Sequence, residues 1–222
     1  MTIRLTEVLK MIEGYNIAGQ SKTRTRVEND YYATPEKATR ELLNNFSFLN
    51  CETILEPACG EGHICKTIQE WDSENKFKIT ATDLIERGFG EGNVDFLTEK
   101  FDNYDLVITN PPFKYAKEFV EKGLEVANKY VVMFAKLQLL EGIGRKDLFE
   151  NHPPKYVYVF RNRVAPLRNG SSVDENGKKW SSTMCFAWFV WEVGFKGEPT
   201  IRWLQTNSKK GRLEKWKQNR RR

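Results

Sequence analysis

The 222-residue sequence has few of the residues from which metal centres and disulfide frameworks are built. It contains two histidines and four cysteines, and no two of the cysteines form a Cys-x-x-Cys pair. Cys59 and Cys65 flank a glycine-rich turn, so we expect reduced thiols and no metal site. The sequence also lacks the ~18-residue apolar run of a membrane span, and its first residues lack an apolar signal region. We therefore expect a cytoplasmic protein without a membrane partner.

The net positive charge of the chain is concentrated at one end. Residues 207–222 carry eight basic side chains and one acid, Glu214, a net charge of +7 that leaves −2 for residues 1–206 out of a formal +5. Such a basic run is either a solvated tail or an arm that binds phosphates. We divide the chain into an N-terminal helix and basic arm (1–30), a main domain (31–206) and a basic tail (207–222).

Strand and helix patterns alternate from residue 53 onward. Thr34 and Pro35 are expected to begin a helix just before this point, with Thr34 as its N-cap. A Gly-, Ser- and Asn-rich loop should join the last two strands as an antiparallel pair. Strands are expected at 53–58, 77–83, 92–97, 104–110, 130–136, 155–161 and 185–193, and helices at 63–71, 115–129 and 145–151. The pattern predicts an α/β fold with a doubly wound, seven-stranded, mostly parallel sheet and an antiparallel last strand.

The turn after the first strand contains two glycines but lacks the marks of a phosphate-binding loop. The third glycine of a dinucleotide fingerprint would fall at Cys65, and no Gly-Lys-Ser or Gly-Lys-Thr follows. Glu56 places a carboxylate beside the turn, which suits a cationic ligand. Asp83 lies 23 residues beyond Gly60, the spacing at which an acid reaches ribose hydroxyls. A nucleoside with a positive centre and no phosphates fits these features, and S-adenosylmethionine is such a ligand.

A second distinctive turn, Asn110-Pro111-Pro112-Phe113, follows the fourth strand. Two consecutive prolines make it rigid and remove two N–H donors, so the turn presents acceptor oxygens beside an aromatic ring. That arrangement can hold a planar group that bears an NH₂. The alternative is a structural turn whose phenylalanine belongs to the core.

Together these motifs resemble those of the class I, S-adenosylmethionine-dependent adenine-N6 DNA methyltransferases, a Rossmann-like fold. Asn110–Phe113 resembles their catalytic motif, and residues 56–62 (EPACGEG) resemble their first cofactor motif. Tyr32-Ala33-Thr34-Pro35 is similar to the segment that precedes it, and Asp83 and Asp95-Phe96 to the second and third cofactor motifs. The motif order is the γ arrangement, and phage-encoded members are often this compact. The resemblance covers residues 30–135 by motif and 156–192 by strand pattern.

The resemblance implies S-adenosylmethionine as cofactor, S-adenosylhomocysteine as product and no metal. Asp83 would accept hydrogen bonds from the ribose, and Asp95 from the adenine amino group, with Phe96 and Leu84 packing against the ring. Thr34 and Gly60 would hold the methionine end. The full implied cofactor set is Tyr32, Thr34, Glu56, Pro57, Ala58, Cys59, Gly60, Gly62, Asp83, Leu84, Asp95, Phe96 and Asn110.

The implied catalytic residues are Asn110, Pro111, Pro112 and Phe113. A target adenine would be flipped out of the nucleic acid. Asn110 Oδ1 and the Pro111 carbonyl would accept its N6 hydrogens while Phe113 stacks on the base, with Phe186 or Trp188 as a second wall. We expect Cys59 and Cys65 to be packing residues, and His63 to have a surface or capping role.

DNA is favoured over RNA as the partner. The expected nucleic-acid contacts are Lys22, Arg24, Arg26, Arg161, Arg163, Lys209, Lys210 and Arg212. Because the final expected strand leaves only about thirty residues, we expect no separate recognition domain. Base readout is expected from the 164–182 loop, the basic arms, a dimer mate or a partner, and the chain is expected to be a monomer or weak dimer. Its biological role stays open between restriction-modification, phage defence and regulation. Three alternatives stay open: an RNA adenine methyltransferase, a protein glutamine methyltransferase and an inactive nucleic-acid-binding module.

Overall fold

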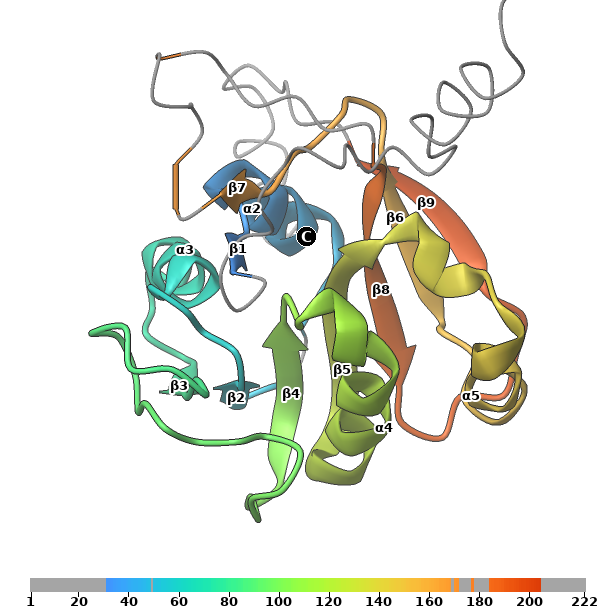
Figure 1. Cartoon of the computed structure of the whole chain (residues 1–222), viewed down its shortest axis with the longest axis horizontal. Helices are drawn as coiled ribbons and strands as arrows, with labels where there is room; N and C mark the ends of the chain where they lie inside the picture. Colours follow the sequence, from blue (N-terminus) through green and yellow to red (C-terminus); the bar gives the residue numbers. More distant parts are fainter. Residues whose placement is uncertain (1–30, 49, 169, 172–176, 178–183, 205–222) are drawn as a thin grey trace, which may run out of the picture.

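The computed structural model describes residues 31–48, 50–168, 170–171, 177 and 184–204, and its centre is one mixed β-sheet (Figure 1). The strand order is β3-β2-β4-β5-β8-β6-β9. β8 runs antiparallel to both β5 and β6, whereas the other neighbouring pairs are parallel. The strands are β2 (Thr53–Glu56), β3 (Lys78–Ala81), β4 (Tyr104–Thr109), β5 (Ala127–Lys136), β6 (Tyr156–Phe160), β8 (Phe186–Glu192) and β9 (Thr200–Leu204).

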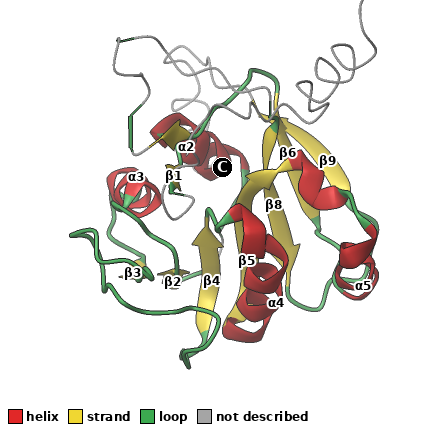
Figure 2. Ribbon diagram, in the orientation of Figure 1, coloured by secondary structure: helices red, strands yellow, loops and turns green. Residues whose placement is uncertain are grey.

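Helices cover the sheet on both faces (Figure 2). α2 (Glu36–Asn45) and α3 (His63–Trp71) pack on one face, and α4 (Ala116–Val126) and α5 (Lys146–Asn151) on the other. Successive strand residues alternate between the two cores: Ile108 and Val132 face α2 and α3, whereas Val107 and Val131 face α4. A sheet buried on both faces requires near-continuous apolar strands, which explains the unbroken apolar run in β5. Short 3₁₀ turns, η2 (Phe113–Tyr115), η3 (Leu137–Leu140) and η4 (Ile143–Arg145), complete these connections.

The predicted α/β fold with a seven-stranded, mostly parallel sheet is confirmed, but one predicted strand is wrong. Residues 92–97 form a turn in which Asn93 has a φ of 60° and the Leu97 N–H donates to Asp95 Oδ1 at 3.0 Å. The seventh strand is β9, which the sequence patterns do not predict and which pairs in parallel with β6. The antiparallel strand, β8, is therefore not the last strand along the chain.

A second, two-stranded sheet lies beside the carboxyl end of β4 (Figure 1). β1 (Tyr32–Ala33) pairs antiparallel with β7 (Leu167–Arg168), so the segment before α2 is tied to the segment after β6. The predicted N-cap is wrong: Pro35 occupies the cap position of α2, and Thr34 Oγ1, 2% exposed as a residue, has no hydrogen-bond partner among the described residues.

The described residues offer neither a membrane-spanning helix nor a cluster of metal ligands. Within them, no helix is long and apolar enough to cross a membrane. In the same part of the chain, no three His, Cys, Asp or Glu side chains gather as a metal site would require. The predicted arm 1–30 and tail 207–222 lie outside the described residues.

Candidate active site

The turn after β2 and the loop after β3 are held together by one carboxylate. Asp83, 9% exposed, accepts hydrogen bonds from the Gly60 N–H at 2.7 Å and from the Ile85 N–H at 2.9 Å. Gly60 and Gly62 have φ values of 55° and 78°, in the left-handed region that favours glycine. These contacts bring the first and second predicted cofactor motifs together at the carboxyl edge of the sheet, where open α/β sheets bind ligands.

A cavity of about 50 Å³ lies between this turn and the turn after β4. Three buried polar atoms on residues that line it have no hydrogen-bond partner among the described residues: Thr34 Oγ1, His63 Nδ1 and Asn110 Oδ1. A buried polar group without a partner costs on the order of 1–3 kcal/mol, so such groups point to a ligand or water that completes them. The lining residues are Tyr31, Tyr32, Ala33, Thr34, Glu56, Ala58, Cys59, His63, Ile64, Asn110 and Pro112.

Glu56 is the acidic group of the cavity and is 2% exposed. Burial raises the pKa of its carboxyl to about 8, although hydrogen bonds from Cys65 lower it in part. These are donated by the Cys65 N–H at 3.1 Å and by its Sγ at 2.7 Å. A cationic ligand in the cavity would favour the ionised carboxylate and lower this pKa, because an opposite charge nearby stabilises the charged form.

Asn110 is held by the segment before α2. Its Nδ2 donates to the Tyr32 carbonyl oxygen at 2.5 Å, which leaves Oδ1 as a buried acceptor without a partner among the described residues. Phe113 follows two prolines, and its ring lies 5.3 Å from the Tyr32 ring with the planes 25° apart. The Phe186 ring is 5.7 Å away, and Lys136 Nζ lies 4.1 Å from the Phe113 centroid. Of the two residues expected as a second wall, Phe186 is therefore beside Phe113, whereas Trp188 is fully buried and donates its Nε1–H to the Ala38 carbonyl at 3.0 Å.

Tyr31 and Arg87 cover the turn after β2, and neither was expected there. A Cβ added to Gly60 would lie 2.4 Å from Tyr31 Cε2, so the tyrosine ring rests directly on this glycine. The Glu61 N–H donates to the Tyr31 hydroxyl at 3.2 Å, and Arg87 Cζ lies 4.2 Å from the ring centroid. Arg87 Nε is 3.9 Å from Asp83 Oδ1. Burial raises the pKa of Tyr31 to about 12, which keeps its hydroxyl protonated. No sequence motif marks this pair.

The remaining predicted cofactor residues lie around the same edge with different exposure. Leu84 is 58% exposed beside Asp83 and offers an apolar surface to a ligand. Asp95 is half-buried, and one of its oxygens accepts from Leu97. Phe96 is 1% exposed because its ring packs against Phe101 and Phe119, so it belongs to the α4-side core. Pro57 and Pro111 are buried in the two turns.

The four cysteines have free thiols. Burial raises the pKa of Cys59 to about 12 and also raises that of Cys65. Both side chains therefore stay protonated thiols that donate hydrogen bonds, Cys65 Sγ to Glu56 at 2.7 Å and Cys59 Sγ to the Phe89 carbonyl oxygen at 3.2 Å.

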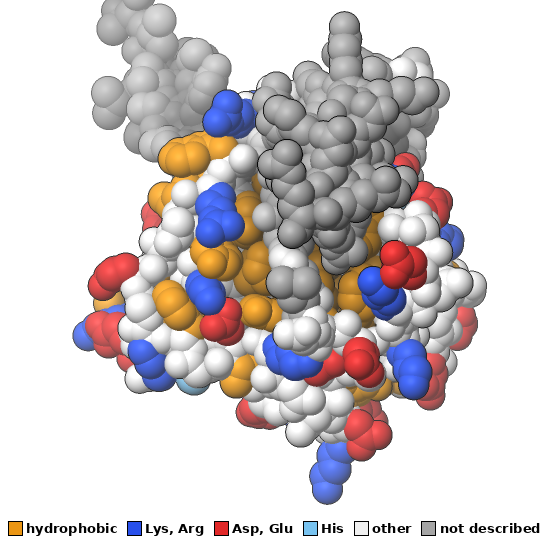
Figure 3. Space-filling view, turned by 180° about the vertical axis from the view of Figure 1, so that it is seen from behind, with side chains coloured by type: hydrophobic (Ala, Val, Ile, Leu, Met, Phe, Trp, Pro, Cys, Tyr) orange, Lys and Arg blue, Asp and Glu red, His pale blue; other side chains and the backbone are white. Residues whose placement is uncertain are grey.

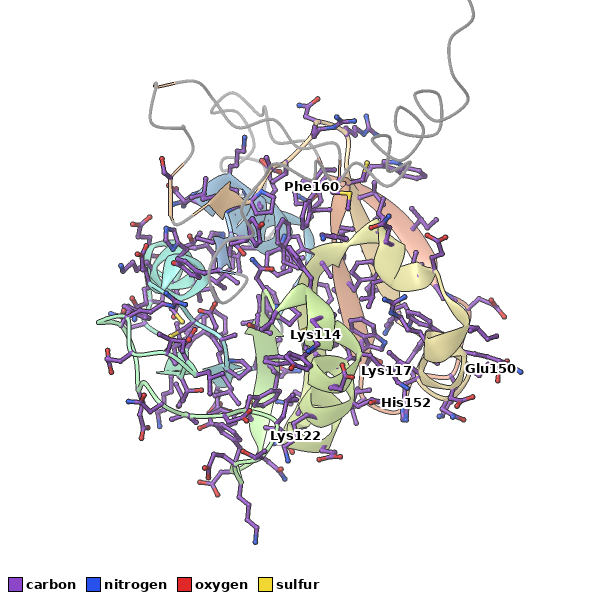
Figure 4. All side chains as sticks on the ribbon, viewed as in Figure 1. Lys114, Lys117, Lys122, Glu150, His152 and Phe160 are labelled. Carbon is purple, nitrogen blue, oxygen red and sulfur yellow. The ribbon has the colours of Figure 1, made fainter. Side chains whose placement is uncertain are left out.

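Basic side chains follow the carboxyl ends of the strands. Arg161 and Arg163 are exposed just after β6, and Lys114 is exposed just after the Asn-Pro-Pro-Phe turn (Figure 4). On the side of the molecule that carries β9, Lys and Arg side chains stand among apolar surface (left in Figure 3). The other predicted nucleic-acid contacts, Lys22, Arg24, Arg26, Lys209, Lys210 and Arg212, lie outside the described residues.

No family model and no curated protein match the sequence. Solved structures match it in architecture. A protein from Listeria monocytogenes described as a class I S-adenosylmethionine-dependent methyltransferase is 13% identical, with a TM-score of 0.55 over 91% of this chain and 72% of that one. The fold is the class I methyltransferase fold.

Two further neighbours with a methyltransferase fold are described as different kinds of methyltransferase. The methyltransferase subunit of a type I restriction-modification system from Streptococcus thermophilus is 13% identical with a TM-score of 0.62, over 92% of this chain. The present chain spans only 55% of that subunit's length. A protein from Pyrococcus horikoshii described as an RNA methyltransferase is 13% identical with a TM-score of 0.56, over 86% of this chain and 100% of that one.

Proposed function

We propose that this chain transfers a methyl group from S-adenosylmethionine to the exocyclic N6 amino group of adenine in DNA. One observation carries the proposal: Asn110 Oδ1 is a buried acceptor without a described partner, and its amide is oriented by the bond from Nδ2 to the Tyr32 carbonyl. An acceptor fixed in this way suits an amino group, which has hydrogens to donate. Two further features support the proposal: the fold is a methyltransferase fold, and the Asn-Pro-Pro-Phe turn resembles the catalytic motif of adenine-N6 methyltransferases.

The described residues fit the cofactor at its methionine end. Thr34 Oγ1 and His63 Nδ1 are unpaired polar atoms on the cavity wall, and Glu56 adds an acid that complements a positive charge. When bound, S-adenosylmethionine supplies an electrophilic methyl group on a positively charged sulfur. A cavity of about 50 Å³ holds only part of such a ligand, since ligand sites of drug-sized molecules span ~300–1,000 Å³. The nucleoside would extend along Gly60, Asp83 and Leu84, and we propose that Tyr31 and Arg87 move aside to admit it.

The residues of the chain contribute mainly by positioning. Asn110 Oδ1 would accept one N6 hydrogen of a flipped adenine, and the Pro111 carbonyl the other, which leaves electron density on nitrogen available for bond formation. Phe113 would stack on the base, with Phe186 close to it. Holding the two reacting groups in line accounts for a large share of the acceleration in such direct transfers.

Support for a nucleic-acid substrate comes from where the basic segments join the described chain. β9 ends at Leu204, whose carbonyl accepts from the Arg161 N–H at 2.8 Å, so the last described residue before the basic tail lies at the carboxyl edge of the sheet. The N-terminal arm joins at Tyr31, against Gly60. We propose that both arms, with Arg161 and Arg163, contact phosphates, and that a dimer mate or partner subunit adds sequence readout. DNA is preferred over RNA on the resemblance of the motifs.

The test is product identification. The protein is incubated with labelled S-adenosylmethionine and, in turn, duplex DNA, single-stranded DNA, RNA and protein, and each product is digested to identify the modified unit. We expect N6-methyladenine in DNA, and none with Asn110→Ala. Label in RNA adenine alone or in protein glutamine would replace the proposal with one of the alternatives, and no transfer to any substrate would favour an inactive binding module.

A further inference from the structure

His63 has a place in the cavity that its expected surface or capping role does not explain. It is the first residue of α3, and its Nδ1 is buried without a hydrogen-bond partner among the described residues. Burial lowers the pKa of the imidazole, so it is neutral at physiological pH. A neutral imidazole can donate from Nδ1, the nitrogen that lacks a partner.

The segment that follows β7 packs against the imidazole on the side away from the cavity. A Cβ added to Gly170 would lie 2.7 Å from Glu61 Oε2 and 3.8 Å from His63 Cε1, so the segment after β7 packs against this end of α3. The ring is thus half-buried between that segment and the cavity.

The chemistry around His63 Nδ1 favours an anionic group. Thr34 Oγ1, a hydroxyl on the same wall that also lacks a partner among the described residues, can donate too. The N-terminus of α3, a nine-residue helix, adds a partial positive charge at the same place. Glu56 stands on the same wall as an acid. Donors beside one acid complement a zwitterionic amino-acid group, which is the end of S-adenosylmethionine that carries a carboxylate and an ammonium.

We propose that His63, together with Thr34, binds the carboxylate of the cofactor's methionine moiety. The proposal rests on the proposed function and adds to it a binding residue. His63 would recognise only the amino-acid half of the cofactor, and a ligand that lacks this half can therefore test its role.

The experiment compares two ligands by calorimetry. S-adenosylhomocysteine carries the amino-acid end, whereas 5′-deoxy-5′-methylthioadenosine lacks it. We expect His63→Ala to raise the dissociation constant of S-adenosylhomocysteine about tenfold or more, in line with the loss of a hydrogen bond to a charged group. The dissociation constant of methylthioadenosine should change by less than about twofold. His63→Asn, whose side-chain amide can present a donor near the Nδ1 position, should recover most of the lost affinity.

A matched control is the second histidine. His152 ends α5, away from the cavity (Figure 4), and His152→Ala should leave both constants unchanged. Equal weakening of both ligands by His63→Ala, or no weakening of either, would overturn the proposal. If the wild-type protein binds neither ligand, the proposed cofactor itself is wrong, an outcome distinct from wild-type binding that His63→Ala leaves intact. Thermal melts of each variant identify any loss of folding, and Thr34→Val then serves as the second probe, with the same ligand-selective loss expected.

Discussion

The Asn110 side chain donates a hydrogen bond from Nδ2 to the backbone carbonyl of Tyr32, 78 residues earlier in the chain, at 2.5 Å. This bond decides which end of the amide is available. With the donor engaged, Oδ1 is left as an acceptor, and the same Tyr32 places its ring against Phe113. The amide and the aromatic ring of the Asn-Pro-Pro-Phe turn are therefore both positioned by the segment before α2.

Replacing Asn110 by alanine should separate chemistry from cofactor binding. Loss of a single positioned polar group in an active site costs ~10²–10³ in kcat, so we expect methyl transfer to fall by about that factor. The dissociation constant of S-adenosylhomocysteine, measured by calorimetry, should stay within about twofold because Glu56, Thr34 and Asp83 are unchanged. An equal loss of binding and transfer would contradict the role assigned to Asn110 Oδ1.

Glu56 should make the free protein less stable as the pH rises. Its folded pKa is about 8, above the ordinary value of 4.5, so the native state binds the proton more tightly than the unfolded state. The stability that this proton contributes is complete below about pH 4.5 and is lost as the pH rises through about 8. In the wild-type protein, urea unfolding should give a lower free energy of unfolding at pH 9 than at pH 5. In Glu56→Gln this fall should be smaller by on the order of a few kcal/mol. The same pH dependence in both proteins would show that Glu56 does not titrate as described.

Removing the Tyr31 ring should uncover Gly60 in the turn after β2. The ring rests on Gly60 and must move before a nucleoside can lie there. The apparent affinity for the cofactor is therefore reduced, because only the molecules in which the ring has moved away can bind it. We expect Tyr31→Ala to lower the dissociation constant of S-adenosylhomocysteine several-fold. Tyr115→Ala is the control, since Tyr115 is 41% exposed and contacts Lys114 at the start of α4. Weaker binding in Tyr31→Ala would instead make the ring part of the bound cofactor's surroundings.

Deleting residues 207–222 should reduce the salt dependence of DNA binding. Each phosphate contact that is lost lowers the slope of log K against log salt by ~0.9 for duplex DNA, so loss of several of the eight basic residues should flatten the slope by several units. Lys76→Ala is a matched single-charge control. Lys76 pairs with Glu74 at 2.7 Å before the start of β3, at the opposite edge of the sheet from the candidate site. A slope that the deletion leaves unchanged would exclude the tail from phosphate binding.

The main sheet was predictable because its central strands carry a local signal. Val131–Ala135 is a short apolar run whose length and composition are typical of a strand buried on both faces, and the helices beside it have their own 3.6-residue period. The failed strand at 92–97 has the same alternation in Val94 and Phe96, but only Phe96 reaches the core and Asn93 turns the chain. β9 was missed because all of its residues except Leu204 are exposed, so it has no core-facing pattern of its own, and because its pairing with β6 is non-local.

The positions of the site loops were predictable for a different reason. Parallel strands end at the same edge, so Glu56, Asp83 and Asn110 were expected near one another from their places in the strand order. The cover formed by Tyr31 and Arg87, and the unpaired Nδ1 of His63, depend on how segments far apart in the chain pack together. No spacing within a single motif contains that information.

The ladder between β1 and β7 spans two residues of each strand and belongs to neither main core. Yet Tyr32, in that ladder, holds the Asn110 amide and faces the Phe113 ring. Because so short a ladder has little stability of its own, it can come apart while the seven-stranded sheet stays folded. The molecule thus couples the end of β4, a central strand of the main sheet, to a two-residue ladder, and the orientation of Asn110 depends on that ladder.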